Sequence, residues 1–343
     1  MTTRLISVII PIYNSEKYLR KCLNSVANQT FTNFEVVMVN DASTDNSIEI
    51  AKEFVLKYEN FNLIDLENNK GVSVVRNVAI EASVGKYLAF LDSDDTMDTD
   101  FLEVMYATII KNNAQVAYCN YRVYHEKTNT ARPVILRKPP KGIYTGKKMC
   151  SMTIADFFSR SYLWNKLWDK RLFISEPQVF FPDMYYEDLA ITSLLLYKAD
   201  TVVVINDLLI NYTIMRKGSI VSSMTEQKLN DYHTTLYVLR NFIEMNNSFK
   251  PFAISFIRIA VSMFFCLPFN ILRIKNPTQK RLSLFKESVA YIYGAISKKY
   301  YSQKIDLTDV NTIPVEIKES FSQQHISNTD TNKDEFELLH FED

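Results

Sequence analysis

Three carboxylates follow a short apolar run in the sequence YLAFLDSDD, where Asp92, Asp94 and Asp95 come directly after residues 87–91. Close carboxylates that are out of water raise one another's pKa and are costly without a counter-charge. A hard divalent cation such as Mg²⁺ or Mn²⁺ is commonly held by one or two carboxylates together with substrate phosphates. The spacing of Asp92 and Asp94 suits such a site, but a solvated loop that caps the next helix explains the same residues.

Other charged residues could take part in the same chemistry. Asp41 follows a second apolar run, where a carboxylate can bind a base or ribose, or can cap the helix expected to start near residue 45. Glu187 and Asp188 open an apolar helix, where acids complement the helix dipole and where one of them could act as a general base. Arg76, on another predicted helix, would point toward these acids or pair with one of them.

The first half of the chain alternates short β-branched runs with stretches of helical spacing, which predicts a parallel sheet with right-handed crossovers. The expected strands cover residues 5–10, 34–39, 61–66 and 87–91. Three helices are expected between them: the first follows an N-cap at Ser15, the second runs from about 45 to 58, and the third covers 72–82. Ligands of such sheets bind beyond the carboxyl ends of the strands. The polar loops 11–14, 40–47 and 92–95 share that rim, which favours a site over a solvated loop.

The second half of the chain is less regular and becomes mostly helical. A helix over 101–111 and a strand over 116–121 precede residues 122–150, which predict a hairpin or a mobile loop. A helix over 188–197, a strand over 201–205 and helices over 226–246, 252–265 and 281–298 follow. We therefore expect a domain over 1–220, a helical subdomain over 221–304 and a partly disordered acidic tail over 305–343.

The chain is neutral overall, with 39 basic and 39 acidic residues, but its charges are segregated. Residues 251–304 carry nine Lys or Arg against one acid, while residues 305–343 carry two basic against ten acidic residues. The basic segment interleaves aromatic and aliphatic residues, which suits peripheral contact with an anionic membrane; a helical subdomain or a homo-oligomer surface explains it equally well. Arg258 and Pro268 interrupt its apolar stretch, so we do not expect it to span a membrane.

Several classes of protein are excluded or disfavoured by composition. A hydrophobic content of 47% excludes wholesale disorder. The four cysteines are scattered, as is typical of reduced thiols in a cytosolic protein. The first apolar run is too short for a secretory signal, and the sequence has no P-loop, GxGxxG or GxSxG motif. We expect a cytoplasmic location, with peripheral contact on the inner face of the plasma membrane left open, and no nucleic-acid partner.

Five segments in order, SVIIPIYNSEKYLRKCLNSVANQT, FEVVMVNDASTDNS, NNKGVSVVRN, GKYLAFLDSDD and YYEDLA, resemble glycosyltransferase family 2. The resemblance covers about residues 5–215, and NKLWDKRLF (165–173) is similar to a block that precedes the catalytic acid in bacterial members. It implies an α/β protein of the GT-A fold, with a Rossmann-like, mostly parallel sheet flanked by helices, and a mainly helical C-terminal extension.

The resemblance also implies a nucleoside pocket. Pro11 and Tyr13 would frame a uracil, and Asp41 would bind its N–H, while Asn69 and Arg76 would complete the pocket. The family's usual Asp-Asp-Gly-Ser reads NDAS here, at residues 40–43. An alanine in place of that glycine predicts a loop with ordinary φ.

The remaining residues carried over from the family are catalytic or metal-binding. Asp92 and Asp94 would form a DxD motif that contacts the ribose and, through Mn²⁺ or Mg²⁺, the diphosphate, with Ser93 at the nucleotide between them. Asp188 would be the catalytic base and Glu187 its support. A single base opposite a leaving diphosphate inverts the anomeric carbon, as in inverting glycosidases, and a metal can neutralise the charge of the leaving group.

The function implied is transfer of a sugar from a nucleotide-sugar, most simply a UDP-sugar, to a hydroxyl of a glycan or lipid-linked acceptor. The setting implied is capsular polysaccharide, exopolysaccharide or cell-wall glycan synthesis. Two alternatives remain: a non-catalytic partner subunit with the same fold, and a sugar-phosphate nucleotidylyltransferase, which would ordinarily carry a Gly-rich phosphate loop where this chain reads PIYNSEKY. The sugar, the acceptor and the linkage are not marked by any motif.

Overall fold

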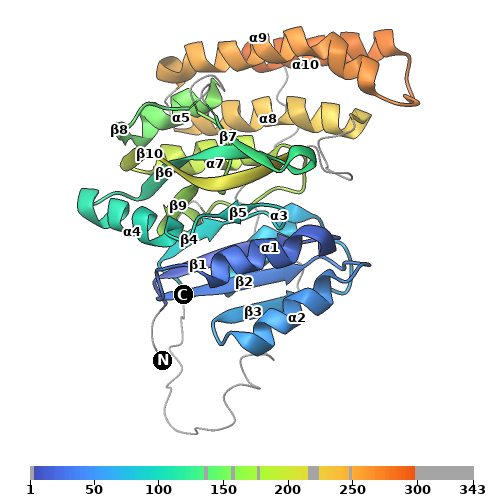
Figure 1. The fold of residues 1–343 in the computed structure, drawn as a ribbon. Coiled ribbons are helices and arrows are strands. Elements are labelled where there is room, and N and C mark those ends of the chain that lie inside the picture. Colours follow the sequence, from blue (N-terminus) through green and yellow to red (C-terminus); the bar gives the residue numbers. More distant parts are fainter. Residues whose placement is uncertain are drawn as a thin grey trace, which may run out of the picture.

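Ten strands form one mixed sheet with helices on both faces (Figure 1). This computed structural model describes residues 4–134, 138–155, 159–175, 178–214, 224–246 and 249–297. The sheet order is β3-β2-β1-β4-β9-β6-β10-β5, with β7 paired to β6 and β8 paired to β10. The predicted α/β class with a helical C-terminal part is confirmed.

The N-terminal half of the sheet is parallel. It contains β1 (Ile6–Ile12), β2 (Phe34–Asn40), β3 (Phe61–Asp65) and β4 (Tyr87–Phe90), joined by α1 (Glu16–Ala27), α2 (Ser47–Lys57) and α3 (Val72–Ala82). β1, β2 and β4 are near-continuous apolar runs because both faces of this sheet are covered. Alternate residues of β1 pack into different cores, Val8 and Ile10 on one face and Ile9 on the other.

The other half of the sheet is mostly antiparallel, and several of its short strands were not predicted from the sequence pattern. It contains β5 (Thr96–Met97), β6 (Val116–His125), β7 (Thr130–Pro133), β8 (Gly142–Thr145), β9 (Lys166–Asp169) and β10 (Thr201–Ile214). β9 lies antiparallel between β4 and β6, and β10 runs parallel to β6. The expectation for residues 122–150 was a hairpin or a mobile loop; the start of this range forms an antiparallel hairpin of β6 with β7. A short 3₁₀ turn, η1 (Glu126–Thr128), connects β6 to β7.

Two groups of helices enclose the sheet, each over its own apolar core. One core includes α1, α2 and α4 (Phe101–Asn112). The other includes α3, α5 (Gly146–Ile154), α6 (Arg171–Ile174) and α7 (Glu187–Lys198). The start of α7 is thereby held over the carboxyl ends of the parallel strands.

Three C-terminal helices follow: α8 (Glu226–Met245), α9 (Phe249–Arg273) and α10 (Arg281–Ser297). α9 and α10 form the outermost layer, and α8 lies beneath them (Figure 1). α8 packs on α7, and α9 and α10 pack on α8. α9 runs unbroken through Arg258 and Pro268, contrary to expectation. By length and composition alone it could cross a membrane, although a third of its most apolar 18-residue stretch is buried within the protein. The expected boundary at residue 220 and the acidic tail over 305–343 lie outside the described residues.

Candidate active site

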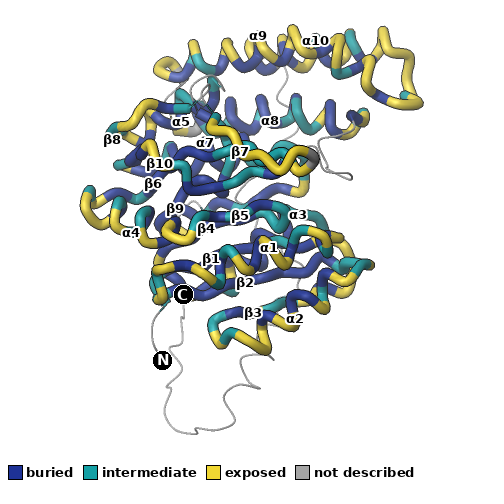
Figure 2. Tube along the Cα trace, in the orientation of Figure 1, coloured by how far each residue is buried: buried dark blue, intermediate teal, exposed yellow. Residues whose placement is uncertain are grey.

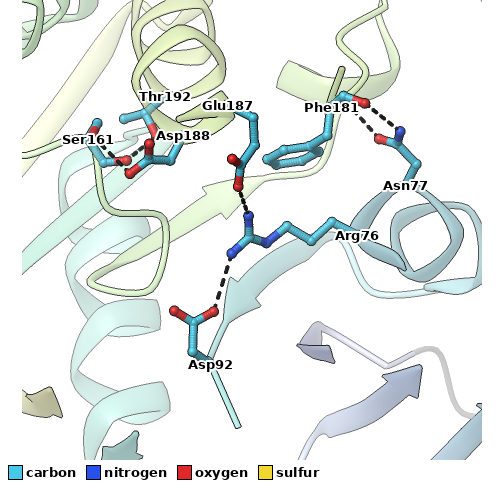
Figure 3. Close-up of polar contacts among 8 residues, drawn as sticks. All are labelled: Arg76, Asn77, Asp92, Ser161, Phe181, Glu187, Asp188 and Thr192. Carbon is cyan, nitrogen blue, oxygen red and sulfur yellow. Dashed lines mark hydrogen bonds and ion pairs between the residues drawn. The ribbon is translucent and has the colours of Figure 1, made fainter. Parts of the chain in front are cut away.

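Arg76 on α3 joins the acid that follows β4 to the acid that begins α7 (Figure 3). Its Nη1 lies 2.5 Å from Glu187 Oε1, and its Nη2 lies 3.3 Å from Asp92 Oδ1. Burial opposes the charge on Arg76, but Glu187, Asp92 and Asp188 together hold the pKa of its guanidinium above the ordinary value. Residues far apart in sequence therefore converge on one buried cation.

Asp188 lies beside this ion-pair network, on the first turn of α7. Burial first, and the neighbouring Glu187 carboxylate second, raise the pKa of Asp188 to about 7. Ser161 Oγ donates a 3.0 Å hydrogen bond to Asp188 Oδ2, and Thr192 Oγ1, one turn further along α7, donates to Ser161 O at 2.6 Å (Figure 3). A carboxylate that titrates near neutral pH and is oriented by a hydroxyl is suited to take a proton.

Lys166 supports the loop that carries Ser161, a role that sequence reasoning missed. Its side chain is fully buried, and its Nζ donates to Asn165 Oδ1 at 2.9 Å, to Arg160 O at 3.3 Å and to Tyr162 O. Burial lowers the pKa of Lys166 to about 7. The Asn-Lys-Leu block marks this residue in sequence, but which carbonyls it reaches depends on how residues 159–163 fold.

Asn77 is a second residue that the sequence did not single out. Its Nδ2 donates to Phe181 O at 3.0 Å, and Phe181 N donates back to Asn77 Oδ1 at 2.8 Å (Figure 3). The Phe181 ring also lies 5.5 Å from the Arg76 guanidinium carbon. This paired contact fixes the segment that leads into α7 against α3, so it sets where Glu187 meets Arg76.

Asp41, directly after β2, contacts the loop between β3 and α3 that contains Asn69. Asp41 accepts hydrogen bonds from Lys70 N at 2.6 Å and Gly71 N at 3.0 Å, and Asn69 Nδ2 donates to Asp41 O at 3.2 Å. Asp41 therefore does not cap α2, which begins at Ser47. Burial raises the pKa of Asp41, and the two amide donors partly oppose this shift.

Tyr13 and Pro11 lie at the end of β1, on the same rim. The Tyr13 side chain is 51% exposed, so its ring is accessible to a planar ligand, while Pro11 is half-buried. Ser15 occupies the N-cap position of α1 without a capping bond from its side chain. Its hydroxyl instead lies 2.7 Å from Ser93 Oγ, which ties the DSDD loop to the start of α1.

The backbone of the 40–43 loop differs from the expectation. Ala42 has a φ of 53°, in the left-handed region, so the prediction of ordinary φ was wrong. An L-residue pays roughly 1–2 kcal/mol for this conformation, which a glycine would avoid. Tyr186, immediately before α7, has a φ of 63° and pays a similar cost. Tertiary contacts impose both conformations, which the local sequence does not favour.

The DSDD acids differ in environment. Asp95 is fully buried and its Oδ1 accepts from Thr213 N at 2.7 Å, whereas Asp92 and Asp94 are partly exposed at the rim. The loop does not cap α4, whose N-cap is Asp100. Among the described residues, no three His, Cys, Asp or Glu side chains gather as a metal-holding group. The two exposed acids fit a cation of the Mg²⁺ type, which takes one or two carboxylates and completes its shell with phosphates and water.

Comparison with known proteins shows which family the N-terminal half of the chain matches. Residues 7–170 match the family model described as glycosyl transferase family 2. The chain is 35% identical over 227 residues to "Glycosyltransferase GlyA" of Streptococcus pneumoniae serotype 4, an alignment that covers 65% of this chain but 32% of that protein. These matches support a glycosyltransferase family 2 domain over residues 7–170 of the chain.

Two solved structures share the fold. Residues 1–349 of S. aureus TarS superpose with a TM-score of 0.68 and 22% identity, covering 93% of this chain and 92% of that one; TarS has also been solved with UDP and with UDP-GlcNAc. The mannosyltransferase PcManGT from Pyrobaculum calidifontis, solved with GDP-Man and Mn²⁺, superposes with a TM-score of 0.52 and 14% identity, covering 87% and 88%. The predicted GT-A architecture is confirmed.

Proposed function

We propose that this protein is an inverting glycosyltransferase that moves a sugar from a UDP-sugar to an acceptor hydroxyl, with Mn²⁺ or Mg²⁺ as cofactor. The observation that carries the proposal is that buried Arg76 joins the Asp92 loop to the Glu187–Asp188 pair. The residues proposed to bind the nucleotide and to accept the proton are thereby brought close together. The nucleotide complexes of TarS and the Mn²⁺ complex of PcManGT, which share the fold, support the donor class and the metal.

The residues divide the reaction among them. Tyr13, Pro11, Asp41 and Asn69 would hold the nucleoside, and Asp92, Ser93 and Asp94 would face its ribose and diphosphate. A divalent cation at Asp92 and Asp94 would supply neutralisation of the charge that develops on the diphosphate as it leaves.

Asp188 would remove the proton from the acceptor hydroxyl as that oxygen attacks the anomeric carbon. Glu187 is already paired with Arg76, so its charge is compensated, whereas Asp188 is oriented by the neutral Ser161 hydroxyl. Two adjacent acids with different environments can serve different roles. One base on the face opposite the diphosphate supports inversion.

The acceptor that we propose is a glycan or a lipid-linked saccharide of bacterial surface-polysaccharide synthesis, used on the cytoplasmic side. This part of the proposal is supported by the family resemblance. A non-catalytic partner subunit would have no need to keep Asp188 oriented by Ser161 and its pKa near neutral, so catalysis is favoured.

A donor screen tests the proposal directly. The full chain is incubated with UDP-, GDP- and dTDP-sugars, and release of the nucleoside diphosphate is followed with and without Mn²⁺ or Mg²⁺. We expect metal-dependent hydrolysis of at least one UDP-sugar, abolished by a chelator. Calorimetry that detects no metal-dependent binding of any nucleotide-sugar would contradict the proposal.

A further inference from the structure

The outer side of α9 and α10 is apolar and is not packed against any other described element. Eleven of the eighteen large hydrophobic residues that are exposed in the described part of the chain lie on these two helices. Tyr291 faces α8, where its ring lies against those of His233 and Tyr237. We call the other ten residues the outer apolar face: Ile254, Ile257, Val261, Phe264, Phe265, Phe269, Leu272, Leu282, Tyr293 and Ile296. Figure 2 shows exposed residues along this layer, at the edge of the molecule.

α9 is apolar on both of its sides. Phe252, Phe256 and Met263 are buried in the core shared with α7 and α8. On the opposite side, Phe265 is 75% exposed and Phe269 is 64% exposed. A helix that is hydrophobic all round is normally buried in protein or lipid, so the second side of α9 lacks the apolar environment that its composition calls for.

The charges around the outer apolar face have one sign. Residues 249–297 contain seven Lys or Arg and a single acid, Glu287. All seven basic side chains are exposed: Lys250, Arg258, Arg273, Lys275, Lys280, Arg281 and Lys286. Each basic residue near an anionic bilayer contributes on the order of 1 kcal/mol to binding. Positive charge beside apolar side chains matches the headgroup and acyl regions of such a bilayer.

We propose that the outer apolar face of α9 and α10 docks the protein onto the surface of an anionic lipid bilayer. α9 would lie in the plane of the interface, with Phe265 and Phe269 in the acyl boundary and the lysines and arginines at the lipid phosphates. Because its other side is part of the protein core, α9 would not cross the bilayer. This inference goes beyond the proposed function and does not depend on it.

A second copy of the chain fits this face less well than lipid does. A two-fold interface would place the same surface of both subunits in contact. The seven basic residues of one subunit would then meet the same seven of the other, and each subunit would contribute only one acid, Glu287. Like charges that face each other across an interface cost several kcal/mol. Complementarity of charge therefore favours the bilayer.

Vesicle flotation of the full chain tests the proposal. Vesicles of phosphatidylcholine alone are compared with vesicles that also contain phosphatidylglycerol, each at low and high salt. We expect binding to the anionic vesicles only, and weaker binding at high salt because surface charges are screened. A double variant F265S/F269S should weaken binding by about tenfold or more, since it removes the two aromatic anchors.

The matched control is Leu56→Ser on α2, where an 89% exposed leucine lies outside the outer apolar face. It should leave flotation unchanged, and donor hydrolysis in the absence of lipid should be the same for all variants, which separates this inference from the proposed function. Three results would overturn the proposal: no flotation with anionic vesicles, equal and salt-insensitive flotation with both kinds, or flotation that F265S/F269S does not change. A concentration-dependent dimer that F265S/F269S dissociates, in a chain that does not float, would show that a second copy covers the face.

Discussion

Asp188 and Glu187 are neighbours in sequence, yet their surroundings give them different chemistry. Glu187 compensates the buried Arg76, while Asp188 accepts a hydrogen bond from Ser161 and has its pKa raised to about 7. Because Glu187 is the acid that pairs with Arg76, Asp188 is the acid left to take a proton from the acceptor hydroxyl.

Replacement of the proposed base should abolish transfer without abolishing donor binding. Asp188→Asn keeps the shape of the side chain and its contact with Ser161 but cannot accept a proton. We expect near-complete loss of sugar transfer with UDP-sugar affinity retained, measured by product formation and by calorimetry. Asp183→Asn, an exposed acid five residues earlier, is the control and should transfer normally. Normal turnover by Asp188→Asn would show that Asp188 is not the base.

The same carboxyl should make stability depend on pH. Below about pH 4 the group is protonated in the folded and unfolded states, and between about pH 4 and 7 the folded state alone keeps the proton. The free energy of unfolding should therefore fall as pH rises from about 4 to about 7. Urea denaturation should find Asp188→Asn more stable than the native chain at pH 8 and similar to it near pH 4. An equal difference at both pH values would contradict the shift.

Loss of the central arginine should destabilise the fold through its partner. Arg76→Met leaves Glu187 buried with an uncompensated charge, a change that typically costs about 3–5 kcal/mol. The double variant R76M/E187Q removes both charges and should recover part of that loss. Urea unfolding of the two single variants and the double variant measures the coupling between the residues. Strictly additive effects would show that the 2.5 Å ion pair contributes no coupling energy.

At the scale of elements, the sequence predicted the parallel half well and the antiparallel half poorly. α3 begins and ends at the predicted residues 72 and 82, because its apolar spacing is regular and a buried face depends on it. β5, β8 and β9 are two to four residues long, too short to show a period. Their conformation is set by the strands they pair with, and the local sequence does not show which distant segments will pair.

The candidate site divides in the same way. The positions of Asp41 and Asp92 beyond the ends of β2 and β4 could be predicted, because an acid that directly follows an apolar run is visible in the sequence itself. Lys166, Asn77 and Ser161 were not, because each acts through a backbone group or side chain whose position depends on tertiary folding. Ala42 was predicted wrongly because its left-handed φ is imposed by its surroundings.

The loop that orients the base should depend on Lys166. Lys166→Met keeps most of the side-chain volume but leaves the carbonyls of Arg160 and Tyr162 without their donor, at about 1–3 kcal/mol for each buried group. We expect a lower transfer rate at saturating donor with unchanged UDP-sugar affinity. Lys170→Met is the matched control. Lys170 directly follows β9, and its Nζ donates to Ser83 O, away from the loop that carries Ser161. Equal effects of the two variants on the rate would point to a general loss of stability.

At the scale of the whole molecule, the C-terminal helices share a core with the ten-stranded sheet. Phe90 of β4, Val78 of α3, Phe256 of α9 and Ile292 of α10 belong to one continuous apolar cluster. The helical subdomain expected from the sequence is therefore packed into the catalytic domain over much of its length.

This shared core predicts a single unfolding transition. Trp164 and Trp168 lie in or beside the sheet, so their fluorescence follows the catalytic domain, while far-UV circular dichroism also follows α8, α9 and α10. The two signals should change together in urea, as expected for one cooperative unit. A helical signal lost at clearly lower urea than the tryptophan signal would show that the C-terminal helices unfold separately.

The continuity of this cluster also limits how the chain can be recombined with its relatives. A chimera that joins a foreign C-terminal segment after β10 would have to replace the inward side chains of α3, α5 and α7 as well. Homologous exchange at that point would otherwise bring together two half-cores selected apart from each other, so functional hybrids should arise only from closely related parents.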